Sequence, residues 1–200
     1  VYEVRLDDGR RLVVKYDETG AGTLPVEAFM LRYLAERTPL PVPAVHAVSD
    51  RLLVMAFAEG ESRFDDEAER HAAELLAALH ELTAPTYGFE CDTLIGGLRQ
   101  PNPPTACWLD FCAGQRRIYM AAEATQAGRL AATTRARGER LAGRVGDWLI
   151  EPTRPARIHG DVWTTNVLAR GGRITALLLP RVLGRALRPT SRFRSVPRRA

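Results

Sequence analysis

The sequence has few cysteines and no long apolar segment. Its three cysteines, Cys91, Cys107 and Cys112, are odd in number and lack the paired spacing of a zinc site or a disulfide framework. No run of about 18 or more apolar residues is present, which argues against a membrane-spanning helix. Nothing at the start resembles a signal peptide, and Val1 reads as mid-strand sequence, so we expect the chain to begin inside a larger fold. These absences predict a cytoplasmic protein with reduced thiols.

Acidic residues are absent from the end of the chain. After Asp161 there are nine arginines and no aspartate or glutamate. The whole sequence has 28 basic and 24 acidic residues, so the first 161 residues carry 19 basic and 24 acidic ones, a balance of −5. Clustered arginines can neutralise nucleic-acid phosphates. The tail from Arg181 to Ala200, however, holds one aromatic residue, Phe193, and no nucleic-acid-binding fold is recognisable, so we do not expect a nucleic-acid partner.

The first 34 residues predict a β-hairpin followed by an amphipathic helix. Residues 2–6 and 11–16 alternate apolar and polar side chains around the turn sequence Asp-Asp-Gly-Arg, and Lys15 ends the second strand. Pro25 suits a first helical turn, which also contains Glu27. The apolar face repeats at helical spacing in Val26, Phe29, Met30, Tyr33 and Leu34. Lys15 could simply be solvated, and Glu27 could simply interact with the helix dipole.

A proline-rich connector and two short strands come next. Prolines at 39, 41 and 43 break the helix, and strands are predicted at residues 44–48 and 52–57. The second strand runs into Ala-Glu-Gly, which fits a linker, and Met55 and Phe57 would then face an adenine; the alternative is a sheet strand ending in a turn. We divide the chain into a β-rich lobe at 1–58, a helical lobe at 59–178 and a disordered tail at 179–200.

The middle of the chain is predicted to be mostly helical. Asp65 or Asp66 can cap a helix whose apolar face consists of Ala68, Ala72, Leu75, Leu76, Leu79 and Leu82. We interpret His71 and His80 as structural or solvated. A long loop is expected at 84–106, helices at 108–127 and 139–150, a short strand at 157–158, and a hairpin pairing 166–170 with 173–178 across two glycines.

Residues 158–168, Ile-His-Gly-Asp-Val-Trp-Thr-Thr-Asn-Val-Leu, have the spacing of a kinase catalytic loop. Phosphoryl transfer needs a carboxylate beside the acceptor hydroxyl and a neutral oxygen ligand near the nucleotide's metal, both held by a short loop. Asp161 and Asn166 could fill those two roles. The alternative is that Asp161 caps a turn and Asn166 sits in an ordinary loop.

These stretches resemble one known family. Residues 76–80 (Leu-Ala-Ala-Leu-His), 83–85 (Thr-Ala-Pro), 87–89 (Tyr-Gly-Phe) and 95–98 (Ile-Gly-Gly-Leu), together with residues 159–168, are similar to the fructosamine kinase, or ketosamine 3-kinase, family. Aminoglycoside and choline phosphotransferases share the His-Gly-Asp and Asn pattern, but Trp163 two residues after the aspartate, together with the Ile-Gly-Gly loop, points to fructosamine kinases. The resemblance covers about residues 1–178.

The resemblance implies an α+β, two-lobed protein-kinase-like fold and ATP-dependent phosphorylation of a small-molecule or protein-bound ketoamine, a deglycation role. It implies ATP and Mg²⁺ as cofactors and leaves the oligomeric state open. Lys15 and Glu27 would form the phosphate-binding pair, and Met55 and Phe57 would line the nucleotide site. The resemblance further implies that Asp161 is the catalytic base and that Asn166 is a magnesium ligand. Trp163 and His159 would contact the substrate.

The sequence also departs from the family pattern. Family members begin with further strands and a glycine-rich loop, which are missing before Val1, and continue after the hairpin with Ile-Asp-Pro, whose aspartate binds metal. Residues 176–180 here read Ala-Leu-Leu-Leu-Pro. The tail from Arg181 lacks the family's final helices and looks like coding sequence read in a shifted frame. The alternatives are therefore a catalytically silent binding remnant or an aminoglycoside- or choline-type phosphotransferase.

Overall fold

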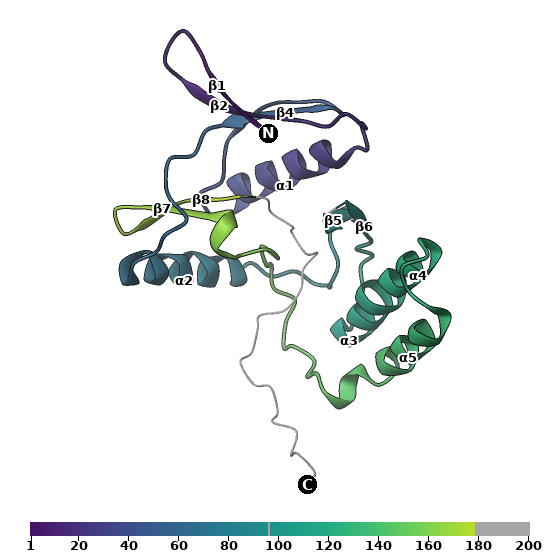
Figure 1. Ribbon diagram of the computed structural model, residues 1–200. Coiled ribbons are helices and arrows are strands. Elements are labelled where there is room, and N and C mark those ends of the chain that lie inside the picture. The colour runs from purple at the N-terminus through teal and green to yellow at the C-terminus, as the bar shows by residue number, and fades with distance from the viewer. Residues whose placement is uncertain (96, 179–200) are drawn as a thin grey trace.

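The computed structural model describes residues 1–95 and 97–178. Its N-terminal part is a four-stranded antiparallel sheet with strand order β1-β2-β4-β3, formed by β1 (Tyr2–Arg5), β2 (Arg11–Tyr16), β4 (Leu52–Ala56) and β3 (Val45–Val48). Helix α1 (Thr23–Arg37) lies beside this sheet (Figure 1) and packs Leu24, Ala28 and Leu31 against Leu53 and Met55. The predicted hairpin, helix and strand pair are confirmed.

Helix α2 (Asp66–His80) and the hairpin of β7 (Val167–Arg170) and β8 (Arg173–Leu177) form the second packed unit. Asp65 caps α2 by accepting a hydrogen bond from the Ala68 N–H at 2.8 Å. The predicted apolar face of α2 packs against the hairpin and against the far end of α1, in one core with Leu34, Val167 and Ile174. Gly171 and Gly172 have φ of 56° and 70°, the left-handed pair that a tight two-residue hairpin turn requires.

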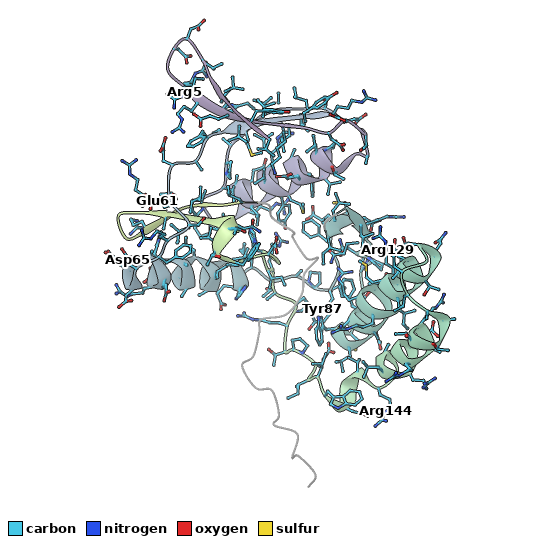
Figure 2. The ribbon with its side chains drawn as sticks, in the orientation of Figure 1. Arg5, Glu61, Asp65, Tyr87, Arg129 and Arg144 are labelled. Atoms are coloured by element: carbon cyan, nitrogen blue, oxygen red, sulfur yellow. The ribbon has the colours of Figure 1, made fainter. Side chains whose placement is uncertain are left out.

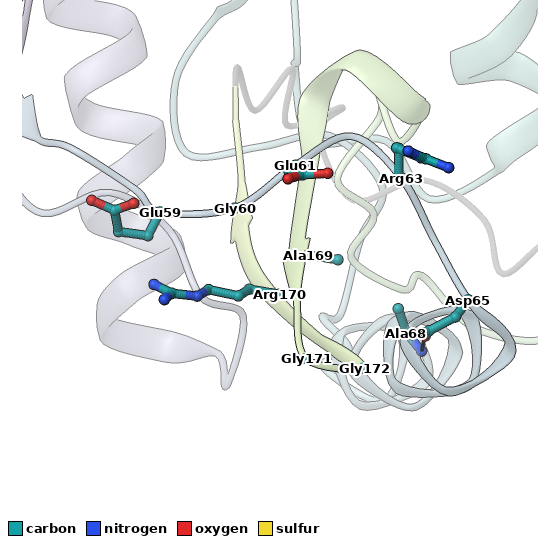
Figure 3. A pocket seen from close by; sticks show the side chains of 10 residues that line it. All are labelled: Glu59, Gly60, Glu61, Arg63, Asp65, Ala68, Ala169, Arg170, Gly171 and Gly172. Atoms are coloured by element: carbon teal, nitrogen blue, oxygen red, sulfur yellow. Dashed lines mark hydrogen bonds between the residues drawn. The ribbon is translucent and has the colours of Figure 1, made fainter.

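The linker between these two units is attached to β7. Glu61 N–H donates to the Ala169 carbonyl and Ala169 N–H donates to the Glu61 carbonyl, both at 2.9 Å. Figure 3 shows Gly60 and Glu61 passing beside Ala169. Gly60 has φ of 146°, and a Cβ there would lie 2.6 Å from Thr175 Oγ1. The close approach of linker and hairpin therefore requires glycine at position 60.

The region predicted as a long loop, 84–106, contains a small hairpin, so that prediction is wrong. Strands β5 (Thr93–Ile95) and β6 (Leu98–Gln100) pair antiparallel. The Thr93 hydroxyl donates to Gln100 Oε1 at 2.9 Å and accepts from Asn102 Nδ2 at 3.0 Å. Three-residue strands stabilised by buried polar contacts give no clear alternation of apolar residues, so the sequence pattern missed them.

Of the two later helices, the first is confirmed and the second is displaced. The helix predicted at 108–127 is divided into α3 (Trp108–Phe111), a π-helical stretch (Cys112–Ile118) and α4 (Tyr119–Gln126). The helix predicted at 139–150 is wrong in place: α5 spans Ala132–Ala142, and a 3₁₀ turn follows at Val145–Asp147. Gly143 and Gly146 interrupt the chain there, while α5 begins in a stretch of threonines and arginines without apolar periodicity.

Two connections join this helical part to the rest. Tyr87, labelled in Figure 2, packs with Trp108 and Phe111, and its hydroxyl donates to the Pro152 carbonyl at 3.2 Å. The predicted strand at 157–158 is absent from the described residues, where an isolated bridge pairs Thr83 with Ala156 instead.

His71, on α2, has a structural role, because its Nδ1 accepts the Ile174 N–H at 2.9 Å.

No helix within the described ranges is long and apolar enough to cross a membrane. The predictions for residues 179–200, including tail disorder and the absence of family helices, lie outside the described residues.

Candidate active site

A cavity of about 560 Å³ separates the N-terminal sheet from the β7–β8 hairpin. Its walls are mostly apolar, with one ion pair. The lining residues are Val1, Val13, Lys15, Glu27, Leu31, Pro43, Met55, Ala56, Phe57, Ala58, Gly60, Leu168 and Leu178. A cavity of this size, apolar with a few polar groups, is typical of a small-molecule or cofactor site.

The polar end of the cavity is formed by Lys15 and Glu27. Lys15 Nζ lies 2.5 Å from Glu27 Oε1, and the two side chains are 15% and 14% exposed. Helix α1 begins at Thr23 and has no acidic residue in its first turn, so the prediction that placed Glu27 in that turn is wrong. Glu27 therefore faces the lysine rather than the helix terminus. Lys15 is also the only lysine in the sequence.

Met55 and Phe57 line the same cavity, one inside β4 and one just after it. Met55 pairs with Val13 across the sheet and is buried. The Phe57 ring lies under the Arg11 guanidinium, 3.5 Å from its centroid, and the Phe57 N–H donates to the Arg11 carbonyl at 3.2 Å. This stacking holds the linker against β2. It therefore fixes the cavity wall at the point where the chain leaves the sheet.

Asp161 and Asn166 are in direct contact. Asn166 Nδ2 donates to Asp161 Oδ2 at 2.7 Å and to the Asp161 carbonyl at 3.2 Å. Gly160, with φ of 85°, turns the chain before Asp161, and a 3₁₀ turn at Thr164–Asn166 brings Asn166 back. Because the amide nitrogen faces Asp161, the amide oxygen of the buried Asn166 faces away from it and is the group that could accept or coordinate.

His159 supports this loop from inside. It is 1% exposed, and its Nδ1 accepts the Asp161 N–H at 3.4 Å. Burial lowers the pKa of His159 to about 4, although the Asp161 charge acts in the opposite direction. The imidazole is therefore neutral at pH 7, with its proton on Nε2, which has no hydrogen-bond partner among the described residues. Trp163, two residues after Asp161 in the sequence, is by contrast 59% exposed.

We expect the burial of His159 to make folding acid-sensitive. The unfolded chain binds a proton below about pH 6.5 that the native state excludes down to about pH 4, so stability falls as the pH drops through this window. The expected loss between pH 7 and 5 is about 2 kcal/mol. His159→Asn keeps an acceptor for the Asp161 N–H but cannot titrate, so it should lose this component in urea unfolding curves. Equal pH dependence in both proteins would contradict the assignment, since carboxylate contributions are common to both.

The described residues that line the cavity include neither Asp161, Asn166 nor Trp163, but they include Leu168, two residues after Asn166. Sequence reasoning missed Leu168, Leu178 and Gly60 as cavity residues. The sequence pattern that could have indicated Leu168 is the apolar strand directly after Asn166. This strand takes the chain from the catalytic loop to Leu168, which forms the cavity floor. The site thus has two parts, the Lys15–Glu27 pair and the Asp161–Asn166 pair, connected through β7.

A second cavity, of about 530 Å³, is lined by the linker, the start of α2 and the β7–β8 turn (Figure 3). Its side chains are of mixed charge, with Glu59, Glu61 and Asp65 against Arg63 and Arg170. Glu59 is already paired with Arg11 at 2.5 Å, and Asp65 caps α2. The charges that remain are exposed, so this cavity defines no binding chemistry.

In the part of the chain that the structure describes, no group of three or more histidine, cysteine, aspartate or glutamate side chains could hold a metal ion. Asp161 therefore belongs to no such group within those residues.

Solved structures with the same arrangement define the class of fold. The ternary complex of APH(2″)-IIa with streptomycin and ATP matches 92% of this chain and 67% of its own, with a TM-score of 0.57 and 16% identity. This likeness shows a two-lobed, protein-kinase-like phosphotransferase fold, as predicted. A family model for fructosamine kinase matches residues 2–180, and the chain belongs to that family.

Two more relatives agree with this membership. A crystal structure assigned as a fructosamine-3-kinase from Thermobifida fusca has a TM-score of 0.79 and 32% identity, covering 92% of this chain and 64% of that one. A probable ketoamine kinase from Synechocystis sp. is 30% identical over 131 residues, 65% of this chain and 43% of the relative. The chain thus spans less than two thirds of the length of either.

Proposed function

We propose that this chain binds ATP in the cavity between the sheet and the β7–β8 hairpin. The Lys15–Glu27 ion pair inside that cavity is the observation that carries the proposal. Glu27 fixes the ammonium, and a fixed ammonium at the end of an apolar cavity suits the α- and β-phosphates of a nucleotide. Met55 and Phe57 would line the adenine end.

The proposed reaction is transfer of the γ-phosphoryl group to a sugar hydroxyl of a ketoamine, either free or attached to a protein. Asp161 would accept the proton of the attacking hydroxyl, held in place by Asn166 and by the His159 contact with its backbone. Trp163 would provide an exposed aromatic surface for the sugar. Family membership supports this substrate class.

Magnesium does not fit the residues present. Mg²⁺ is usually bound by one or two carboxylates together with substrate phosphates. Asn166 offers an amide oxygen, but the Asp161 carboxylate already accepts from Asn166, and the sequence has no acidic residue after Asp161. We therefore derive no step through the metal, and we expect phosphoryl transfer by this chain to be slow.

Nucleotide binding can be tested by chemical labelling of the Lys15 side-chain amine. Because Lys15 is the only lysine, an amine-reactive acyl-phosphate derivative of ATP has one side-chain target, which peptide mass spectrometry can identify. We expect labelling of Lys15 that free ATP blocks. Glu27→Gln leaves the amine in place but removes its partner, so the ATP concentration needed for protection should rise about tenfold.

Glu18→Gln, on the exposed turn after β2, is the matched control and should protect like the wild type. Labelling of Lys15 that ATP does not block would contradict nucleotide binding in this cavity.

A second candidate function is nucleotide binding without transfer. The lack of any carboxylate after Asp161 favours it. ATP-protected labelling of Lys15, combined with no transfer to fructosyl-amines, aminoglycosides or choline, would support this candidate over the enzyme.

A further inference from the structure

Arg157 is a buried cation placed between helix α1 and the catalytic loop. It is 6% exposed, and its guanidinium lies 4.2 Å from the centroid of the Tyr33 ring and 5.6 Å from that of Phe89. Tyr33 and Phe89 are themselves in edge-to-face contact at 4.9 Å. A desolvated guanidinium over an aromatic face is a strong directional contact.

This contact has one end on α1 and the other at the catalytic loop. Tyr33 is six residues after Glu27 on the same helix. On the other side, the Arg157 N–H donates to the Leu82 carbonyl at 2.9 Å, and the chain reaches His159 two residues later. His159 in turn accepts the Asp161 N–H. Movement of α1 relative to Arg157 would therefore separate the two halves of the site.

We propose that Arg157 is a positioning residue that holds α1, and with it the Lys15–Glu27 pair, in register with Asp161. The inference rests on the proposed function, in which both pairs act on one nucleotide. The ring of Tyr33 carries the contact, because its buried hydroxyl has no hydrogen-bond partner among the described residues.

Arg37 is a matched control on the same ring. Its guanidinium lies 4.7 Å from the Tyr33 centroid, but its side chain is 53% exposed and pairs with Glu90 at 3.6 Å. Arg37 is thus a second cation over Tyr33 that does not adjoin the catalytic loop. If stacking on Tyr33 only stabilised α1, loss of either arginine would raise exchange in α1 alone, with a smaller effect for the exposed Arg37.

Hydrogen exchange tests the coupling without any substrate. In Arg157→Met we expect amide exchange to rise about tenfold both in α1 and in residues 158–168, because the two segments lose their common contact. Arg37→Met should change α1 alone. Tyr33→Leu should raise exchange in the same two segments, and Tyr33→Phe should behave as the wild type.

Steady-state kinetics gives the second readout. We expect Arg157→Met to lower kcat about tenfold while ATP protects Lys15 from labelling as it does in the wild type. A rise in exchange at 158–168 without a change in α1 would overturn the proposal, and so would an unchanged kcat. If Arg157→Met does not fold, Tyr33→Leu decides by the same criteria. A wild type that transfers no phosphate but shows the coupled exchange would contradict the proposed reaction and leave the coupling established.

Discussion

Asp161→Asn should lower the rate of ATP-dependent phosphorylation of a fructosyl-amine by about 100-fold or more, the usual effect of removing a general base. The amide keeps the size of the side chain and an oxygen that can accept from Asn166 Nδ2, so the loop geometry should persist. ATP protection of Lys15 should stay within twofold of the wild type, because Asp161 is outside the cavity lining. Transfer of radiolabelled γ-phosphate gives the sensitivity that a slow enzyme needs.

Asp50→Asn provides the matched control for this experiment. Asp50 is an exposed aspartate in the turn between β3 and β4, so the same substitution there should leave the rate unchanged. Equal activity of wild type and Asp161→Asn would remove Asp161 from the proposed mechanism.

Leu179→Asp should raise the rate of transfer at least about tenfold and make it depend on Mg²⁺. Leu179 lies outside the described residues, and the prediction rests on the sequence alone. The family resemblance implies Ile-Asp-Pro after the hairpin, where this chain has Leu178-Leu179-Pro180. The substitution supplies the carboxylate whose absence we take to limit the reaction.

Leu179→Asn separates charge from shape in this test. It is polar and similar in size to aspartate but has no negative charge to offer a cation. Equal rates for Leu179→Asp and Leu179→Asn, at every Mg²⁺ concentration, would show that a missing carboxylate does not limit transfer.

Local patterns predicted much of the fold. The β1–β2 hairpin, α2 and the β7–β8 hairpin all have strong periodicity with glycine or aspartate at the turn or cap, and all three are confirmed. The β5–β6 hairpin was missed because buried polar residues such as Gln100 and Asn102 stabilise it rather than an apolar face. Helix α5 was misplaced because its first half has no apolar stripe.

The candidate site was predictable where neighbouring residues define it. The spacing of Asp161 and Asn166 placed both residues on one short loop, and the structure shows them in contact. The order of strand and helix predicted a pairing of Lys15 with Glu27, which the structure also contains. The position of Arg157 was not predictable, because its contacts come from α1 and from the loop at Phe89, far away in sequence. Tertiary packing alone brings those segments together.

The attachment of Glu61 to Ala169 limits how this molecule can bend. Two backbone hydrogen bonds join the end of the linker to the strand that follows the catalytic loop, so these segments move as one body with the cavity floor at Leu168. Two further contacts tie the N-terminal part to this body: the Leu177 N–H donates to the Pro41 carbonyl, and the far end of α1 shares a core with α2 and the hairpin. The linker is thus one of several attachments, which together keep Lys15 at a fixed separation from the cavity floor.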